Sequence, residues 1–241
     1  MNTKGGTLVR NMVVAASLLA MPVSSFAGTL QVSPINIEAI APASTSTVTL
    51  TNLEGKGVIN SQVRVFKWSI VNGQEKLTPT KDVVASPPAL TIKEGGNATV
   101  RIVRLLKTPA TTEETYRLLV DEIPPAPTKG TQAVAFAVRH NIPVFFTPGG
   151  LNSKLNWTAK VGKGGIRVAA TNEGQRHVRL ASLQIVGNGE TDIFNNGLAG
   201  YVLAGSANGW TIKSKAIKSG STIKIMAKGN DGPIEATVQV Q

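Results

Sequence analysis

Apolar and polar residues alternate with a period of two through most of the chain. A period of two is the pattern of a β-strand that buries one of its faces. Turn signals such as Asn72-Gly73 separate the alternating segments. In the first half of the chain the segments predict about seven strands, as in one immunoglobulin-like sandwich. They are residues 30–38, 47–52, 62–68, 90–103, which hold two strands around Gly95-Gly96, 116–123 and 133–146.

The alternation stops at Pro148-Gly149-Gly150, which predicts a domain hinge. A second and more glycine-rich set of strands follows, and the sequence shows no helical segment with a capping box and an apolar stripe. We therefore predict an all-β fold of two immunoglobulin-like sandwiches, with domains over residues 28–148 and 149–241. The strands of the second domain are expected at residues 166–172, 178–185, 198–203, 209–212, 222–226 and 234–240.

The first 27 residues have the pattern of a secretory signal peptide. Lys4 and Arg10 precede an apolar run over residues 12–21, and Ser25-Phe26-Ala27 offers small residues to a signal peptidase. The run is shorter than the roughly 18 to 20 residues that cross a bilayer. We expect cleavage before Gly28 and no membrane insertion; an uncleaved N-terminal anchor is the alternative.

Composition and charge limit the sources of stability and the partners that the protein could have. The chain has no cysteine, so an exported protein of this sequence must draw its stability from its cores rather than from disulfides. The formal net charge of +11 includes Lys4 and Arg10, the only charged residues before Gly28. The basic residues are scattered and form no run interleaved with aromatic residues, so we expect no nucleic-acid partner. Acidic proteins, an anionic membrane surface or solubility explain the charge equally well.

Residues that could support catalysis or bind a metal are sparse. His140 and His177 are far apart and have no carboxylate at ligand spacing, so we expect no metal site and interpret both as solvated. Glu113 and Glu114 are adjacent, and neighbours in a strand point to opposite faces, so they cannot flank one bond together. No nucleophile elbow or phosphate-binding loop is present. The sequence therefore predicts neither an enzyme nor a cofactor.

Residues 133–146, expected to end the first domain, are unusually apolar on both faces. If this strand lies at a sheet edge, its unpaired backbone groups beside an apolar row form a template for a foreign strand. A central strand buried on both faces is the alternative. The apolar row consists of Val134, Phe136 and Val138.

Several stretches of the chain resemble a known family, most specifically Glu122-Ile123-Pro124-Pro125 followed by the apolar strand. On these residues the chain resembles the PapD-like periplasmic chaperones of the chaperone–usher pathway, and it is closer in style to the archaic branch, which handles spore-coat-U-like pilins. The second domain matches more loosely, at residues 178–180 and 230–232. The matching stretches of the first domain are residues 30–34, 86–88, 96–102, 116–125 and 142–148.

The resemblance implies a boomerang of two sandwiches in the periplasm that lends the last strand of its first domain to a pilus subunit. In this donor-strand complementation, Val134, Phe136 and Val138 would fill the open groove of the subunit. The subunit would then pass to an outer-membrane usher. The resemblance also implies a network of charges between the domains, which maps onto Arg101, Glu113 and Asp231.

The sequence departs from the better-known members at the site that holds the subunit's C-terminal carboxylate. Those members have basic residues where this chain has Asn36 or its neighbours and Pro143. A buried carboxylate still needs a charged donor. We expect Arg139 to serve, with Arg101 and Arg104 as further candidates; a solvated strand arginine is the alternative for Arg139.

The leading hypothesis is therefore a non-enzymatic chaperone of fimbrium biogenesis whose partners are pilus subunits and an usher. A structural cell-surface or pilus component without a chaperone role is the alternative, but two complete strand sets argue against it. An enzyme is opposed by the lack of any acid, base or nucleophile constellation. Two points stay open: self-association of the free protein through its edge strand, and whether Pro34 ends the first strand or lets it switch sheets.

Overall fold

The computed structural model describes residues 30–53, 57–124 and 137–241, and these residues contain no helix. Ten strands form the first sandwich, one sheet of which has the order β1-β3-β8-β6 and the other β2-β10-β9-β4-β5, with β7 beside β4. The ten strands are β1 (Leu30–Ser33), β2 (Ile37–Ile40), β3 (Thr45–Asn52), β4 (Ile59–Val71), β5 (Gln74–Pro79), β6 (Val83–Ser86), β7 (Ala89–Ile92), β8 (Asn97–Arg104), β9 (Glu114–Ile123) and β10 (Arg139–Thr147).

A second sandwich follows β10. Its smaller sheet has the order β11-β12-β16 and its larger sheet the order β14-β13-β17-β18, with β15 beside β13. The eight strands are β11 (Leu155–Gly162), β12 (Gly165–Asn172), β13 (Val178–Gly187), β14 (Glu190–Ile193), β15 (Leu198–Val202), β16 (Ala207–Ile212), β17 (Thr222–Lys228) and β18 (Pro233–Gln239).

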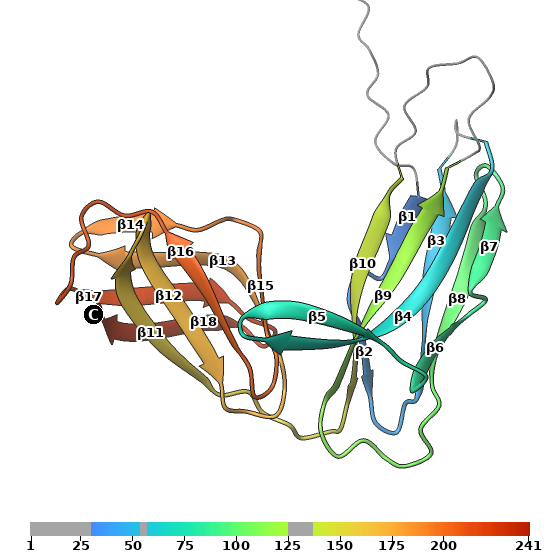
Figure 1. The fold of residues 1–241 in the computed structure, drawn as a ribbon, viewed down its shortest axis with the longest axis horizontal. Helices are drawn as coiled ribbons and strands as arrows, with labels where there is room; N and C mark the ends of the chain where they lie inside the picture. Colours follow the sequence, from blue (N-terminus) through green and yellow to red (C-terminus); the bar gives the residue numbers. More distant parts are fainter. Residues whose placement is uncertain (1–29, 54–56, 125–136) are drawn as a thin grey trace, which may run out of the picture.

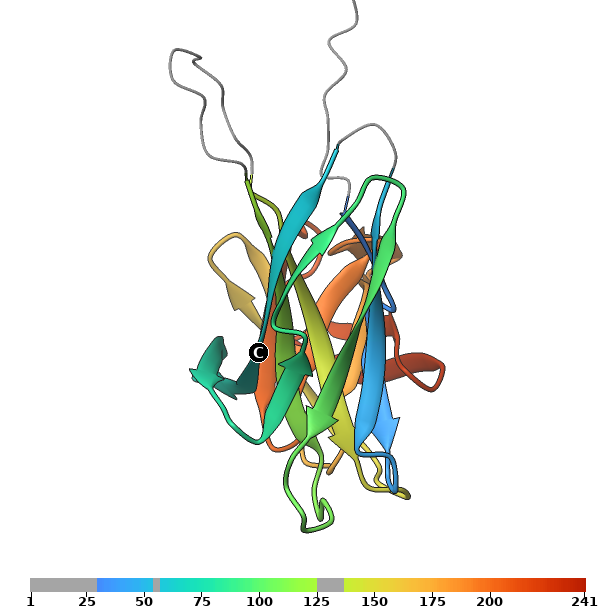
Figure 2. The ribbon, with the colours of Figure 1, turned by 90° about the vertical axis from the view of Figure 1, so that its right-hand side faces the viewer.

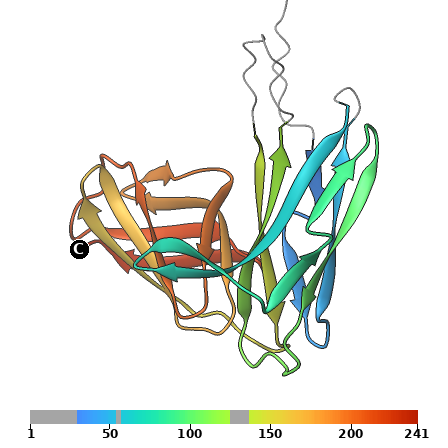
Figure 3. The ribbon, with the colours of Figure 1, turned by 45° about the vertical axis from the view of Figure 1, so that its right-hand side comes forward.

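The two sandwiches join at one end and lie at a wide angle to each other (Figure 1). The long β4–β5 hairpin extends from the first sandwich to the second, which the view in Figure 3 also shows. Figure 2 looks along the molecule from the side of the first sandwich. The prediction of an all-β protein of two sandwiches in a boomerang arrangement is confirmed. Among the described residues there is no helix of the length and apolar character that a membrane crossing requires.

The chain switches sheets between β1 and β2. β1 pairs antiparallel with β3 in one sheet, whereas β2 pairs parallel with β10 in the other. Leu30 and Val32 of β1 and Ile37 and Ala39 of β2 are all buried in the same core. The switch thus lets one N-terminal segment contribute apolar side chains to both sheets. Pro34 therefore lies in the segment where the chain switches sheets.

Alternate strand residues fill one core in each sandwich, as the period-two pattern requires. Val48, Leu50, Val100 and Ile102 show the pattern in the first core, where each is fully buried. A third apolar cluster lies where the sandwiches meet. It joins Trp68 and Phe145 of the first sandwich to Tyr201 and Leu203 of the second.

Candidate partner-binding site

One edge of β10 is only partly covered by a neighbouring strand. β9 pairs with β10 over residues 139–146. On the other side, β2 pairs only with residues 144–147. Within the part of the chain that the structure describes, residues 139–143 therefore have no strand beside them on that side.

The backbone groups at this open edge point away from the sheet. The N–H of Glu122 in β9 donates to the carbonyl oxygen of Val138, at 2.9 Å. In an antiparallel pair such bonds are made by alternate residues, so the groups of Arg139, Asn141 and Pro143 face the opposite side. Arg139 and Asn141 thus offer an N–H and a C=O each, and Pro143 offers only its C=O. This is the template that an added strand needs.

The apolar row predicted for this strand is only partly covered by the structure. Val134 and Phe136 lie outside the described residues, so their role stays a prediction. Val138 is half-buried, and β10 begins one residue after it. It alternates in phase with Ile142 and Val144, both of which lie in the first core. Val138 therefore continues the core-facing side of β10.

Arg139 lies at the open edge in a cluster of three charges. Its Nε donates to Asp121 Oδ1, and Arg64 Nη2 donates to Asp121 Oδ2 at 2.6 Å. Burial alone would raise the pKa of Asp121, but the hydrogen bonds from Arg139 and Arg64 outweigh it and hold that pKa below its usual value. The two arginine side chains stay 58% and 41% exposed. Because two guanidinium groups share one carboxylate, the cluster keeps an excess positive charge.

Arg104 does not fit the expected role of a carboxylate anchor. Its guanidinium makes two bonds of 2.8 Å to the carboxylate of Glu114. It also donates to the carbonyl oxygens of Leu106 and Thr108, at 2.8 and 2.7 Å. Its side chain is only 7% exposed. Arg104 therefore holds the loop between β8 and β9 and has its donors in use.

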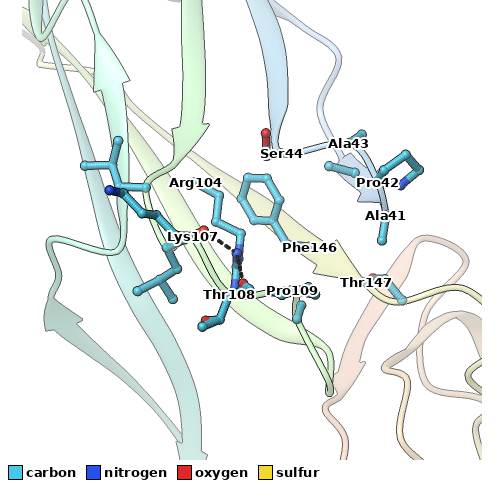
Figure 4. Close-up of a pocket in the computed structure, with 14 residues that line it drawn as sticks. Ala41, Pro42, Ala43, Ser44, Arg104, Lys107, Thr108, Pro109, Phe146 and Thr147 are labelled. Atoms are coloured by element: carbon cyan, nitrogen blue, oxygen red, sulfur yellow. Dashed lines mark hydrogen bonds between the residues drawn. The ribbon is translucent and has the colours of Figure 1, made fainter.

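The same loop borders a groove of about 720 Å³ at one pole of the first sandwich (Figure 4). The turn between β2 and β3 forms the opposite wall, with Pro42 and Ala43. Phe146 lies between the two walls. The lining is mostly apolar. The charge of Arg104 is paired with Glu114, and Lys107 adds a second positive charge to the lining.

The ion pair between Glu114 and Arg104 should stabilise the fold at neutral pH and lose this effect in acid. The hydrogen bond from Arg104 holds the pKa of Glu114 below its ordinary value of 4.5. A carboxyl group with a lowered folded-state pKa stabilises the fold above its unfolded pKa, and this contribution is lost as the pH falls through the folded-state pKa.

We expect Glu114→Gln to lower the free energy of unfolding by about 1.5 to 3 kcal/mol at pH 7, because a charged hydrogen bond is lost. The difference from wild type should shrink as the pH falls below 4.5. Urea denaturation across this pH range measures it. Glu173→Gln, which removes an exposed partner of Lys154, is the control and should change little at any pH. A pH-independent difference for Glu114→Gln would contradict the expectation.

Glu113 lies in a buried contact between the domains. Its Oε1 accepts the backbone N–H of His177 at 2.7 Å, and its Oε2 contacts His177 Nδ1 at 2.8 Å and Thr147 Oγ1 at 3.0 Å. Neither the carboxylate nor the imidazole is exposed. The interpretation of His177 as a solvated residue is therefore wrong: β13 begins immediately after it and directs it into the first domain.

The partners of His177 determine its hydrogen-bonding roles. A carboxylate only accepts, so Nδ1 carries a proton and donates to Glu113. The side-chain amide of Asn230 then donates to Nε2, at 3.0 Å. Both ring nitrogens therefore have a hydrogen-bond partner, and Glu38 Oε1 lies 3.6 Å from Nε2. Among the described residues, no group of three or more His, Cys, Asp or Glu side chains is arranged to bind a metal.

The interdomain charges differ from the predicted set in one residue. Arg176 Nη2 contacts Glu38 Oε2 at 3.0 Å and its Nη1 contacts Asp231 at 3.4 Å. Glu113 and Asp231 thus lie at the joint, as expected. Arg101 does not: it is exposed on β8, in the sheet that contains β3 and β6. Arg176 of the second domain makes the ion pairs with Glu38 and Asp231 instead, and the position of Arg101 in the other sheet does not place it beside the open edge of β10.

Aromatic rings complete the joint. The ring of Phe145 stacks on that of His177, with 3.5 Å between centroids and 5° between planes. Trp68 meets Tyr201 edge-on at 5.4 Å. The guanidinium of Arg117 lies 3.6 Å from the centroid of Trp68. These contacts pack rings and a charged group of the first sandwich against rings of the second.

The structure thus combines two sandwiches, a buried joint between them and an open strand edge. The family described as "Pili and flagellar-assembly chaperone, PapD N-terminal domain" matches residues 29–152. The chain belongs to this family. A comparison with curated protein sequences finds no match.

Solved structures share the fold over most of the chain. A chain of the CsuC–CsuE chaperone–tip adhesion subunit pre-assembly complex, from the archaic chaperone–usher Csu pili of Acinetobacter baumannii, is 24% identical with a TM-score of 0.67, over 89% of this chain and 100% of that one. The YadV chaperone is 16% identical with a TM-score of 0.63, over 88% and 100%. A chain from the complex of the Salmonella enterica SafA pilin with the SafB chaperone is 15% identical with a TM-score of 0.62, over 88% and 98%. The family predicted from sequence is confirmed, and its description is that of an assembly chaperone.

Proposed function

We propose that this protein is a periplasmic chaperone that caps pilus subunits by lending them β10 and then delivers them to an outer-membrane usher. The observation that carries the proposal is the open edge at residues 139–143, which β2 leaves uncovered. The family supports a chaperone role, and similar folds occur in complexes described as chaperone with tip subunit or pilin. The likeness to the Csu complex favours the archaic branch.

The proposed complex combines two sources of affinity. Each backbone hydrogen bond of an added strand contributes about 0.5 to 1.5 kcal/mol. Val138, with Val134 and Phe136 as predicted from the sequence, would each contribute about 1.5 to 3 kcal/mol when buried in a subunit groove. Together, the hydrogen bonds and the buried side chains would bind a subunit tightly without any nucleotide or cofactor.

Arg139 remains the proposed anchor for the C-terminal carboxylate of the subunit. It is exposed at the open edge, and Arg64 adds a second guanidinium on the same aspartate. The excess positive charge of this cluster suits a carboxylate. The interdomain contacts of Glu113, Arg176 and His177 would hold the two domains at the angle that a bound subunit needs.

The remaining parts of the proposal come from the sequence. Residues 1–27 would direct export to the periplasm and be removed. Residues 28–148 would form the strand-lending domain and residues 149–241 the second domain. The strands agree with this division in that β10 ends at Thr147 and β11 begins at Leu155.

Asn141→Pro tests the lent edge directly. The N–H of Asn141 points away from β9, so proline at this position removes an edge donor and places its ring where an added strand must lie. We expect the variant to lose the subunit that co-purifies with the wild-type chain when both are expressed with the neighbouring genes. The measurement is the amount of subunit recovered per chaperone, together with the thermal midpoint of the free chaperone.

Asn141→Ala is the matched control, because it keeps the backbone N–H and should retain the subunit. Phe136→Asp tests the apolar row in the same assay and should also lose it. Equal recovery with Asn141→Pro and with wild type would exclude capping through this edge. If the wild-type chain recovers no subunit, the chaperone function itself fails.

A further inference from the structure

Several polar side chains of the first domain keep a buried atom without a hydrogen-bond partner among the described residues, and three of them lie together on the neighbouring strands β4, β9 and β10. The atoms are Ser61 Oγ on β4, Glu122 Oε1 on β9 and His140 Nε2 on β10. A buried polar atom left without a partner is costly, and native proteins contain few of them. Three on neighbouring strands therefore call for an explanation. We call Ser61, Glu122 and His140 together the polar seat.

The members of the polar seat share one face of the sheet. Ser61 lies directly opposite Glu122, and His140 lies opposite Val120, two residues before Glu122 in β9. Val120 lies in the first core, so the seat lies on the core-facing side, one layer beyond the apolar side chains. His140 Nε2 and Glu122 Oε1 are 3.9 Å apart, which is too far for a hydrogen bond. The seat therefore does not satisfy itself.

The seat opens toward the edge that the proposed function uses. His140 belongs to residues 139–143, which β2 leaves uncovered. Its side chain is 28% exposed and that of Glu122 is 15% exposed, whereas Ser61 behind them is 1% exposed. A strand added to β10 places the side chain opposite His140 on the same face, with Cβ atoms about 4.5 to 5.5 Å apart. That side chain would face the seat.

The chemistry of the seat selects what can occupy it. A carboxylate such as that of Glu122 only accepts hydrogen bonds, whereas the Ser61 hydroxyl and the His140 ring can accept or donate them. A donor is therefore the one kind of group that all three members of the seat can bind. An apolar side chain in the same place would bury the three atoms without any partner.

We propose that the polar seat receives a hydrogen-bond-donating side chain, such as Ser, Thr, Asn or Lys, from the strand that a pilus subunit adds to β10. The inference rests on the proposed function. It assigns the seat a role in selecting the register of that strand. A slip of one residue would turn the donor to the other face of the sheet and leave the seat empty.

Glu122→Leu tests the inference with two measurements on the full chain. We expect binding of the co-purifying subunit to weaken at least tenfold, because the acceptor for its donor is lost. The thermal midpoint of the free chaperone should stay the same or rise, because the substitution removes a buried acceptor that has no partner in the free protein. A purely structural role for Glu122 predicts the opposite for the free chaperone, namely a clear fall in the midpoint.

Asp192→Leu is the matched control. Asp192 also has a buried oxygen without a partner, but it lies on β14 of the second domain, and its replacement should leave subunit binding unchanged. If Glu122→Leu binds as wild type does while Asn141→Pro loses the subunit, water fills the seat and the inference fails while the proposed function stands. If Asn141→Pro keeps the subunit, the proposed function fails and the inference with it. Loss of binding together with a lowered midpoint for Glu122→Leu also overturns the inference.

Discussion

Glu113→Ala is expected to lower the free energy of unfolding by at least about 3 kcal/mol, because it leaves three donors without an acceptor and each unsatisfied buried donor costs about 1 to 3 kcal/mol. The substitution leaves the backbone N–H of His177, its Nδ1–H and the hydroxyl of Thr147 without the acceptor they now share. Because these donors belong to both domains, the fixed angle between the domains should be lost as well. Urea denaturation measures the first effect and small-angle X-ray scattering the second.

Asp231→Ala is the control for this expectation. Asp231 belongs to the same joint, but its side chain is 75% exposed and it meets Arg176 at 3.4 Å. Such a pair contributes little, so the free energy of unfolding should change by less than about 0.5 kcal/mol. If Glu113→Ala costs no more than Asp231→Ala, the buried carboxylate does not hold the domains together.

Phe145→Ala is expected to cost about 3 to 5 kcal/mol, the range for a fully buried phenylalanine truncated to alanine. Phe145 is not exposed at all, and it packs on Trp68, His177 and Tyr201. The change leaves a cavity at the joint rather than inside one sandwich. Urea denaturation followed by tryptophan fluorescence should report it, because Trp68 lies against the cavity.

The matched control is Phe194→Ala in the second domain, where the phenylalanine is 38% exposed. Truncation of a partly exposed ring leaves no closed cavity, so the expected cost is about 1 kcal/mol or less. Similar costs for the two variants would show that the aromatic cluster adds no stability beyond that of an ordinary surface contact.

The period-two pattern predicted the fold class well because burial in a sandwich depends on alternate residues, which are visible in the sequence. It could not show which strands are neighbours, since pairing depends on contacts distant in the sequence. The partial cover of β10 by β2 is such a contact, and so is the layer formed by Ser61, Glu122 and His140. A polar residue at a core-facing position of the alternation was the available signal for Ser61 and His140.

The joint between the domains was harder to predict. His177 meets Glu113 across 64 positions of sequence, and nothing in the local pattern of either residue indicates burial. The expected basic residue, Arg101, came from the resemblance, whereas Arg176 and His177 fill that role from the opposite domain. Arg104, one of the candidate anchors, donates to the loop between β8 and β9, and the path of that loop is not visible in the sequence pattern.

The segment from β1 to β2 sets how much of β10 the protein covers with its own backbone. Because β1 stays with β3 and only β2 crosses to the other sheet, the protein completes its own ladder against residues 144–147 of β10 and goes no further. A longer β2 would pair with residues 139–143 of β10 as well. The backbone groups of this edge would then be hydrogen-bonded within the protein and closed to an added strand. The point at which the chain changes sheets thus divides β10 into two parts: residues 144–147, which β2 pairs with, and residues 139–143, which an added strand could reach.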